Sequence, residues 1–240
     1  MTQPLFAIGD IHGQFDAMQG ALSKIEADPD FPARVVFLGD YLDRGPQAKD
    51  VIQCLIDGIA AGRDWVALMG NHDRYMLKFL ETPRFRDPNT RDHLEWLDSR
   101  IGGRETLASY GVDAHSRRSP EDIHADAVEA IPQAHIDFIR NLPLMHVTDE
   151  HIFVHAGIRP GVPLDEQVEE DLIWIRKGFL EDTRDHGRLV VHGHTALHVP
   201  QRYENRVNLD GGAGYGRPLY PAIIEGRAVS LLAGGHRVPL

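Results

Sequence analysis

The stretch RVVFLGDYLDRGP, residues 34–46, changes from an apolar run to acidic and basic residues at a glycine. Residues 35–38 are continuously apolar, which is typical of a strand covered on both faces. Asp40, Asp43 and Arg44 follow at once. The stretch therefore predicts a buried strand whose carboxyl end carries side chains suited to binding or catalysis.

The same change of character follows four other apolar runs, LFAIG (5–9), WVALMG (65–70), HIFVH (151–155) and RLVVHG (188–193). Each ends at Asp, Asn or His residues beside a glycine. Ligands bind at the carboxyl ends of strands in open α/β sheets. We therefore expect the five strand ends to bring together Asp10, His12, Asp40, Asn71, His155 and His194.

These six side chains offer oxygen and imidazole ligands and no thiolate, which suits Mn, Fe or Zn bound for catalysis. Six ligands exceed what one catalytic ion with open positions needs. They suit two ions about 3.5–4 Å apart that share one carboxylate. The sequence predicts two divalent metal ions, with Mn²⁺ favoured and Fe or Zn as alternatives.

The rest of the chain predicts an α/β (α+β) fold in one domain, residues 1–240. Apolar residues recur at helical spacing in 14–27 and 46–61, between the first three strands. Polar residues 82–150 predict a helical insert or cap. The helices expected in this insert are HLEWLDSRI (93–101), ETLASYG (105–111), PEDIHADAVEA (120–130) and PQAHIDFIRNL (132–142). The strands expected near the end of the chain are RVNLDGG (206–212), LYPAIIEG (219–226) and AVSLL (228–232).

Composition narrows the functional classes. The chain has 240 residues, 42% of them apolar and 25% charged, as in globular proteins, and it shows no signal peptide or membrane span. The net charge of −11 argues against binding nucleic acid through bulk electrostatics. A single cysteine, Cys54, excludes an internal disulfide and favours a reducing, cytoplasmic location. We interpret Cys54 as a core residue; the oligomeric state is left open.

Together, the motifs at the strand ends resemble those of the calcineurin-like metallophosphoesterases. Within that superfamily, GDYLDRG resembles the PPP-type serine/threonine protein phosphatases. WLDSRIGGRETLASYG (96–111) and DLIWIR (171–176) resemble the small bacterial and phage branch. The motifs that carry the resemblance are GDIHG (9–13), GDYLDRGP (39–46), GNHD (70–73), HAG (155–157) and HGHT (192–195).

The resemblance implies a β-sandwich flanked by helices, with two metal ions at the strand ends. It assigns Asp10 and His12 to the first metal and Asp40 to the bridge between the two. It assigns the second metal to Asn71, His155 and His194. A hydroxide that bridges the two ions would then attack phosphorus.

The resemblance also assigns roles around the metals. Arg44 would clamp the phosphate, since its planar fork matches phosphate oxygens. His72 would donate a proton to the leaving group, with its tautomer held by Asp43. A second phosphate clamp is expected at Arg176, with Arg159 as the alternative.

Three further residues are placed by the same motifs. The family pattern puts the metal ligand of HGH after the glycine, so His192 is expected to support the site without binding metal. Asp210 and Tyr215, in LDGGAGYGRPL (209–219), are candidates to line the site.

The expected activity is hydrolysis of phosphoserine, phosphothreonine and small phosphoesters, with a phosphorylated protein as partner. The alternative is symmetrical hydrolysis of diadenosine tetraphosphate. Asp43 favours the phosphatase activity, because symmetrical diadenosine tetraphosphate hydrolases typically lack the equivalent aspartate. Asp73 favours the tetraphosphate hydrolase, since GNHD is common among those enzymes. A cyclic phosphodiesterase and an inactive scaffold are further alternatives, and the complete ligand set disfavours a scaffold.

Overall fold

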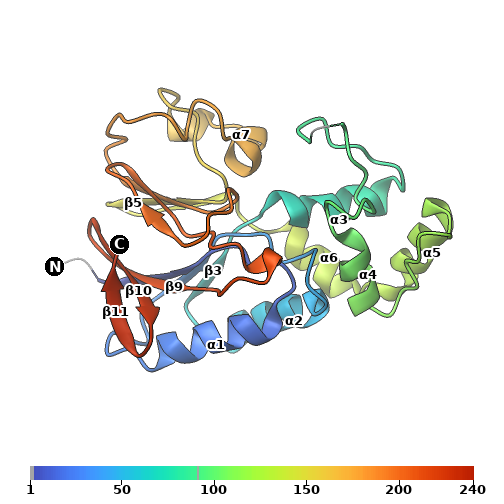
Figure 1. Ribbon diagram of the computed structural model, residues 1–240, viewed down its shortest axis with the longest axis horizontal. Coiled ribbons are helices and arrows are strands. Elements are labelled where there is room, and N and C mark those ends of the chain that lie inside the picture. The colour runs from blue at the N-terminus through green and yellow to red at the C-terminus, as the bar shows by residue number, and fades with distance from the viewer. Residues whose placement is uncertain (1–2, 91) are drawn as a thin grey trace.

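The computed structural model describes residues 3–90 and 92–240. Its strands form two sheets that face each other (Figure 1). The six-stranded sheet has the order β11-β10-β9-β1-β2-β3, and the five-stranded sheet has the order β4-β5-β6-β8-β7. The strands are β1 (Leu5–Ile8), β2 (Val35–Phe37), β3 (Trp65–Ala67), β4 (Met145–Val147), β5 (His151–Val154), β6 (Leu189–His192), β7 (Gln201–Arg202), β8 (Arg206–Asn208), β9 (Pro221–Glu225), β10 (Ala228–Ala233) and β11 (His236–Pro239).

Parallel pairing concentrates strand ends at one edge of each sheet. β1, β2 and β3 are parallel, and the crossovers between them contain α1 (Phe15–Glu26) and α2 (Ala48–Ala60). In the second sheet β5, β6 and β8 are parallel, with β4 and β7 antiparallel at its edges. Loops that follow β1, β2, β3, β5 and β6 can therefore converge between the sheets.

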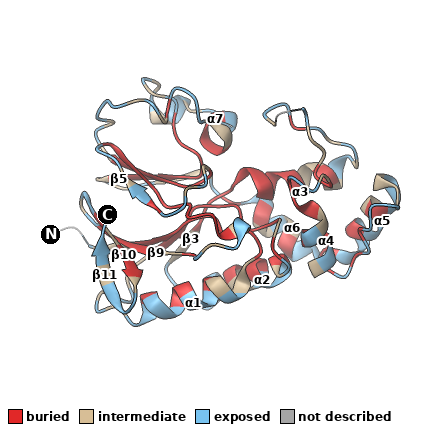
Figure 2. Ribbon diagram, viewed as in Figure 1, coloured by how far each residue is buried: buried red, intermediate tan, exposed pale blue. Residues whose placement is uncertain are grey.

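Strand alternation explains why both faces of the first sheet are buried. Phe6 and Ile8 of β1 pack into the cluster shared with α1 and α2, whereas Ala7 between them packs against the second sheet. Val36 of β2 also points between the sheets, where it lies in one cluster with Val191 of β6. The short helix α7 (Glu169–Trp174) covers the outer face of the second sheet. Figure 2 shows burial concentrated where the sheets face each other, which confirms the predicted helix-flanked sandwich.

The remaining helices lie at one end of the molecule (Figure 1). They are α3 (Asn71–Glu81), α4 (Gly103–Ser109), α5 (Pro120–Ala130) and α6 (Gln133–Arg140). Pro120 occupies the first turn of α5, and the Ser119 hydroxyl caps it by accepting the Asp122 N–H at 3.1 Å. The helices predicted at 105–111, 120–130 and 132–142 are present. Met145–Val147 forms β4 of the second sheet, so the helices of the 82–150 span end at Arg140.

The helix predicted over 93–101 is wrong. Here the chain makes successive turns with i→i−3 hydrogen bonds, from Asp98 N–H to Glu95 O and from Ile101 N–H to Asp98 O. The apolar residues that suggested a helical face are buried for another reason, since Trp96 points inward to a carboxylate of the site. Among the described residues, none of the helices combines the length and the hydropathy needed to cross a bilayer.

Candidate active site

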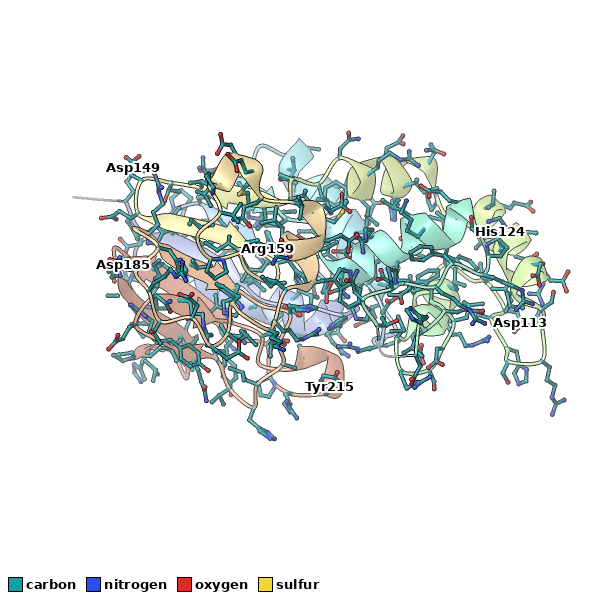
Figure 3. The ribbon with its side chains drawn as sticks, turned by 90° about the horizontal axis from the view of Figure 1, so that it is seen from above. Asp113, His124, Asp149, Arg159, Asp185 and Tyr215 are labelled. Atoms are coloured by element: carbon teal, nitrogen blue, oxygen red, sulfur yellow. The ribbon has the colours of Figure 1, made fainter. Side chains whose placement is uncertain are left out.

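The structure brings together all six predicted ligands, which come from both sheets. Asp10 and His12 follow β1, Asp40 follows β2, and Asn71 begins α3 directly after the turn that ends β3. His155 follows β5 and His194 follows β6. All six side chains are buried, with exposed fractions of 7% or less. Figure 3 labels Asp113 and His124 at one end of the molecule and Asp149 and Asp185 at the other, with Tyr215 between them.

The backbone at these positions is unusual for residues that carry a Cβ. His12, Asp40, Asp43, Arg44 and His194 have φ values of 48°, 55°, 71°, 67° and 65°. This left-handed region costs about 1 kcal/mol or more for a residue other than glycine. The surrounding hydrogen bonds hold these conformations in place, for example those from the Ile11 and His12 N–H groups to Asp40 O at 3.1 and 2.8 Å.

Two glycines allow the carboxylates to reach the centre. A Cβ on Gly70 would lie 2.1 Å from Asp40 Oδ1, and a Cβ on Gly193 would lie 2.1 Å from Asp10 Oδ1. Any larger residue would displace the carboxylate that the site needs. Glycines next to the ligands therefore serve the close approach of side chains from different strands.

Around His155, hydrogen-bond acceptors face one another in a way that calls for a cation. His155 Nδ1 lies 2.8 Å from Leu38 O, while Nε2 lies 3.0 Å from Asn71 Oδ1 and 3.4 Å from Asp40 Oδ1. Burial lowers the pKa of His155, which favours the neutral ring with a single N–H. When that N–H serves Leu38 O, the Nε2 lone pair faces two oxygen acceptors. A divalent cation among these atoms satisfies all three.

His194 completes this group. Its Nε2 is buried and has no hydrogen-bond partner among the described residues. Asp40, His155 and His194 each offer one ligand atom within 4.8 Å of the others. Burial, followed by His155, lowers the pKa of His194, so the ring is neutral and able to bind metal.

A second group shares Asp40 and lies toward β1. His12 Nδ1 donates to Leu42 O at 2.8 Å, which leaves the Nε2 lone pair 3.6 Å from Asp40 Oδ2. Burial raises the pKa of Asp10, and the neighbouring carboxylates of Asp210 and Asp40 raise it further. Carboxylates gathered in this way repel one another, and a cation relieves that repulsion. The residues present thus fit two divalent ions with Asp40 between them.

His72 lies beside the first group, and geometry alone would also admit it as a ligand with His12 and Asp40. Its Nδ1, however, donates to Asp43 Oδ2 at 2.6 Å. Its Nε2 accepts from Arg44 Nη2 at 3.1 Å, and Arg44 Nη1 donates to His12 Nε2 at 2.7 Å. A histidine with one nitrogen fixed by a buried carboxylate and the other facing the site is arranged to donate or accept a proton.

Asp73 has a structural part in the site. Its carboxylate is fully buried and accepts the backbone N–H groups of Gly70, Asp40 and Tyr41, each at 2.9 Å. It thereby caps the N-terminus of α3 and fixes the turn that presents Asp40. The aspartate of GNHD thus shapes the metal turn and does not itself face the two ligand groups.

The two candidates for a second phosphate clamp differ in their surroundings. Arg176 is exposed, and desolvation lowers the pKa of its guanidinium while the charges of Asp40 and Asp10 act in the opposite direction, which places it within reach of those two carboxylates. Arg159 instead forms a two-pronged pair with Asp171, at 2.6 and 2.5 Å, and is labelled over the second sheet in Figure 3. Because Arg159 is already paired with Asp171, Arg176 is the better candidate.

The loop after β8 closes the site from the side of His12. A Cβ on Gly214 would lie 2.6 Å from the His12 ring. The Tyr215 ring is 60% exposed, and the Arg44 guanidinium carbon lies 4.7 Å from its centroid. Asp210 is buried beside Asp10 and accepts the Gly212 N–H at 2.8 Å. Both predicted lining residues therefore lie at the site, and Tyr215 marks its exposed rim (Figure 3).

His192 points away from the ligand groups. Its Nε2 lies 3.3 Å from Arg206 Nη1, and its ring packs edge-on against Phe179 at 5.2 Å. Burial, followed by Arg206, lowers its pKa to about 3, so the ring stays neutral. This position is that of a residue supporting the His194 turn.

Sequence reasoning missed two residues that contact Asp43. Trp96 Nε1 donates to both Asp43 oxygens, at 2.9 and 3.0 Å, and the Thr106 hydroxyl donates to Asp43 Oδ1 at 2.8 Å. Both are buried. The available signal was the motif WLDSRIGGRETL itself, in which a Trp and a Thr stand on either side of a double glycine.

Comparisons with known proteins agree with this geometry. The family model described as calcineurin-like phosphoesterase matches residues 4–239. The bis(5'-nucleosyl)-tetraphosphatase PrpE [asymmetrical] of Bacillus mycoides (strain KBAB4) is 24% identical over 236 residues, covering 88% of this chain and 87% of the relative. The symmetrical bis(5'-nucleosyl)-tetraphosphatase of Dechloromonas aromatica (strain RCB) is 28% identical over 155 residues, which are 65% of this chain and 44% of the relative.

A solved structure supports the fold. The crystal structure of a putative diadenosine tetraphosphatase superimposes with a TM-score of 0.66 at 19% identity and covers 100% of this chain and 94% of that one. The family model spans nearly the whole chain, and the ligand groups lie where the strand-end motifs predicted them. The chain belongs to the calcineurin-like phosphoesterase family.

Proposed function

We propose that the chain hydrolyses dinucleoside polyphosphates, with bis(5′-nucleosyl) tetraphosphates as the substrate class. The observation that carries the proposal is the pair of ligand groups that share Asp40, with Arg44 and Arg176 facing them. Relatives that match most of the chain are bis(5′-nucleosyl)-tetraphosphatases, which favours this alternative over the phosphoprotein substrate expected first from the sequence.

Six residues would hold the metal ions. When bound, two divalent cations, for which we propose Mn²⁺, supply Lewis-acid charge and an activated water for attack on phosphorus. Asp10, His12 and Asp40 would hold one ion. Asp40, Asn71, His155 and His194 would hold the other.

The arginines bind and orient the polyphosphate in this proposal. Arg44 is half-buried beside both His12 and His72, and its guanidinium presents parallel N–H donors to a phosphate. Arg176 supplies a second positive charge, close enough to Asp40 and Asp10 for their charges to oppose the lowering of its guanidinium pKa by desolvation. The exposed ring of Tyr215 lies against Arg44 at the rim, where it can stack on a nucleobase.

A second activity is favoured by one contact. The Asp43–His72 hydrogen bond of 2.6 Å orients a proton donor, and proton donation matters most when the leaving group is an alkoxide. A nucleotide phosphate leaves as a stable anion and needs no such help. The pair therefore supports hydrolysis of phosphoserine, phosphothreonine and small phosphomonoesters at the same site.

One comparison of initial rates tests both activities. The purified protein, reconstituted with Mn²⁺, is given diadenosine tetraphosphate or a phosphothreonine peptide, and an Asp40→Asn variant prepared in parallel controls for contaminating phosphatases. We expect faster cleavage of the dinucleotide, and the nucleotide products distinguish a central cut from an asymmetric one. Faster release of phosphate from the peptide would overturn the order proposed here, and no metal-dependent cleavage of either would refute both.

A further inference from the structure

The carboxylate of Asp43 is held by two side chains from the segment 96–106. Asp43 is fully buried and accepts from His72 Nδ1, Trp96 Nε1 and the Thr106 hydroxyl. The Thr106 oxygen also accepts the Asp43 backbone N–H at 2.7 Å. Three side chains thus determine where this carboxylate can lie, and two of them, Trp96 and Thr106, are outside the motifs of the strand ends.

The same segment supports the strained backbone next to Asp43. Arg44, with φ of 67°, donates its N–H to Gly102 O at 3.2 Å. Gly102 has φ of 98°, and a Cβ there would lie 2.5 Å from Arg44 N. Trp96 is itself fixed between Phe79, with ring centroids 5.0 Å apart, and Gly103. The segment 96–106 therefore packs as one unit against the Asp43–Arg44 turn.

We propose that Trp96 and Thr106 are positioning residues, which hold Asp43 in the orientation that aims the His72 proton at the leaving group. The inference rests on the proposed function, and in particular on the phosphomonoester activity. In that reaction hydroxide adds to phosphorus and the bond from phosphorus to the leaving oxygen breaks. The electron pair stays on the leaving oxygen, which takes a proton from His72 Nε2. For this step the ring carries a proton on both nitrogens, and the Arg44 N–H that points at Nε2 in the structure turns to the phosphate instead.

Substrates with different leaving groups can distinguish a positioning role of Trp96 and Thr106 from a general contribution to fold stability. A carboxylate that loses one of its donors can rotate, and the His72 Nδ1 contact is no longer held in one direction. Alkoxide leaving groups then suffer most, because their departure depends on the proton. A p-nitrophenolate or a nucleotide depends on it least.

The test replaces each donor conservatively. Trp96→Phe removes the N–H and keeps an aromatic ring against Phe79, while Thr106→Val removes the hydroxyl with little change of volume and Thr106→Ser restores it. Trp65→Phe, at the start of β3 where the ring packs against Phe37 and Gly58 of α2, is the matched control. Turnover is measured on a phosphothreonine peptide and on p-nitrophenyl phosphate.

We expect the ratio of peptide turnover to p-nitrophenyl phosphate turnover to fall about tenfold or more for Trp96→Phe and Thr106→Val, which is part of what acid catalysis contributes. Thr106→Ser should restore the ratio, and Trp65→Phe should keep it. Equal losses on both substrates, or no loss, would overturn the positioning role. If either variant fails to fold, the other still decides.

A spectroscopic readout separates this inference from the proposed function. The short Asp43–His72 contact should give a strongly deshielded proton in the NMR spectrum, which weakens or moves upfield in Trp96→Phe and stays in Trp65→Phe. The same signal in wild type and Trp96→Phe would overturn the inference. A wild-type protein that cleaves no phosphomonoester would refute the proposed activity, while the spectrum would still decide the positioning role.

Discussion

Replacing Asp73 by asparagine should lower the free energy of unfolding by about 2 kcal/mol. The Asp73 carboxylate accepts three buried N–H groups, those of Gly70, Asp40 and Tyr41. Asparagine keeps one acceptor oxygen, placed to serve Gly70 and Asp40, and turns its amino group toward the Tyr41 N–H. A buried N–H without an acceptor costs about 1–3 kcal/mol.

Two smaller effects change the predicted loss in free energy of unfolding in opposite directions. The two retained hydrogen bonds weaken because their acceptor is no longer charged. Against this, burial and the charge of Asp40 raise the pKa of Asp73, so a neutral amide relieves an unfavourable charge. The two offset each other in part, which leaves the unpaired Tyr41 N–H as the main loss.

Urea unfolding, in chelator and in Mn²⁺, measures the effect. Asp57→Asn is the matched control, because Asp57 is exposed and accepts only from Gln53 Nε2 among its side-chain contacts, at 2.8 Å. The control should change stability by no more than about 0.5 kcal/mol. Asp73→Asn should also reduce the stabilisation by Mn²⁺, since the Asp40 turn is no longer fixed. A loss no larger than that of the control, with full Mn²⁺ stabilisation, would refute the assigned role of Asp73.

Three other predictions concern the ligands, the proton donor and pH. Asp40→Asn should abolish the rise in Tm caused by Mn²⁺ together with most turnover, and a retained rise would contradict a shared ligand. His72→Asn should keep that rise but lower turnover on a phosphothreonine peptide by about 100-fold or more, and an equal loss on p-nitrophenyl phosphate would count against His72 as the proton donor. Burial, followed by Lys49, lowers the pKa of His135, whose ring lies 2.8 Å from the Tyr110 hydroxyl. As pH falls below about 6.5 the unfolded chain gains a proton before the folded one does, so stability falls by up to about 1.4 kcal/mol per pH unit. His135→Gln should flatten this slope in unfolding curves between pH 6.5 and 5, and an unchanged slope would show that His135 does not contribute.

The strand ends were predictable because two independent signals coincide there. A continuous apolar run such as residues 35–38 indicates a strand, and the glycine and aspartate after it mark where the strand ends. Five repetitions of this pattern predicted a common site, and the ligands are found together. The chemical types were also readable from the sequence, since the ends of the first three strands supply oxygen donors and those of β1, β5 and β6 supply imidazoles.

The segment 93–101 shows why other parts could not be predicted. Apolar residues Trp96, Leu97 and Ile101 suggest a helical face, but Trp96 turns inward to donate to Asp43, 53 positions earlier. Such long-range contacts override local periodicity. The positive φ values of His12 and Asp40 are likewise imposed by neighbouring loops, and no local pattern announces them.

The metal ligands come from both sheets, and this affects how the two sheets of the sandwich are held together. Asp10 and Asp40 extend from the first sheet, whereas His155 and His194 extend from the second. Two cations that share Asp40 would crosslink the first sheet to His155 and His194 of the second, beside the His194 N–H that already donates to the Asp10 carboxylate at 3.1 Å across 184 residues. Chelation would cut that crosslink and leave the sheets joined by apolar contacts and a few direct hydrogen bonds, such as that from His155 Nδ1 to Leu38 O. Amide hydrogens of β5 and β6 would then exchange with solvent sooner than those of β1 and β2, which the helices continue to cover.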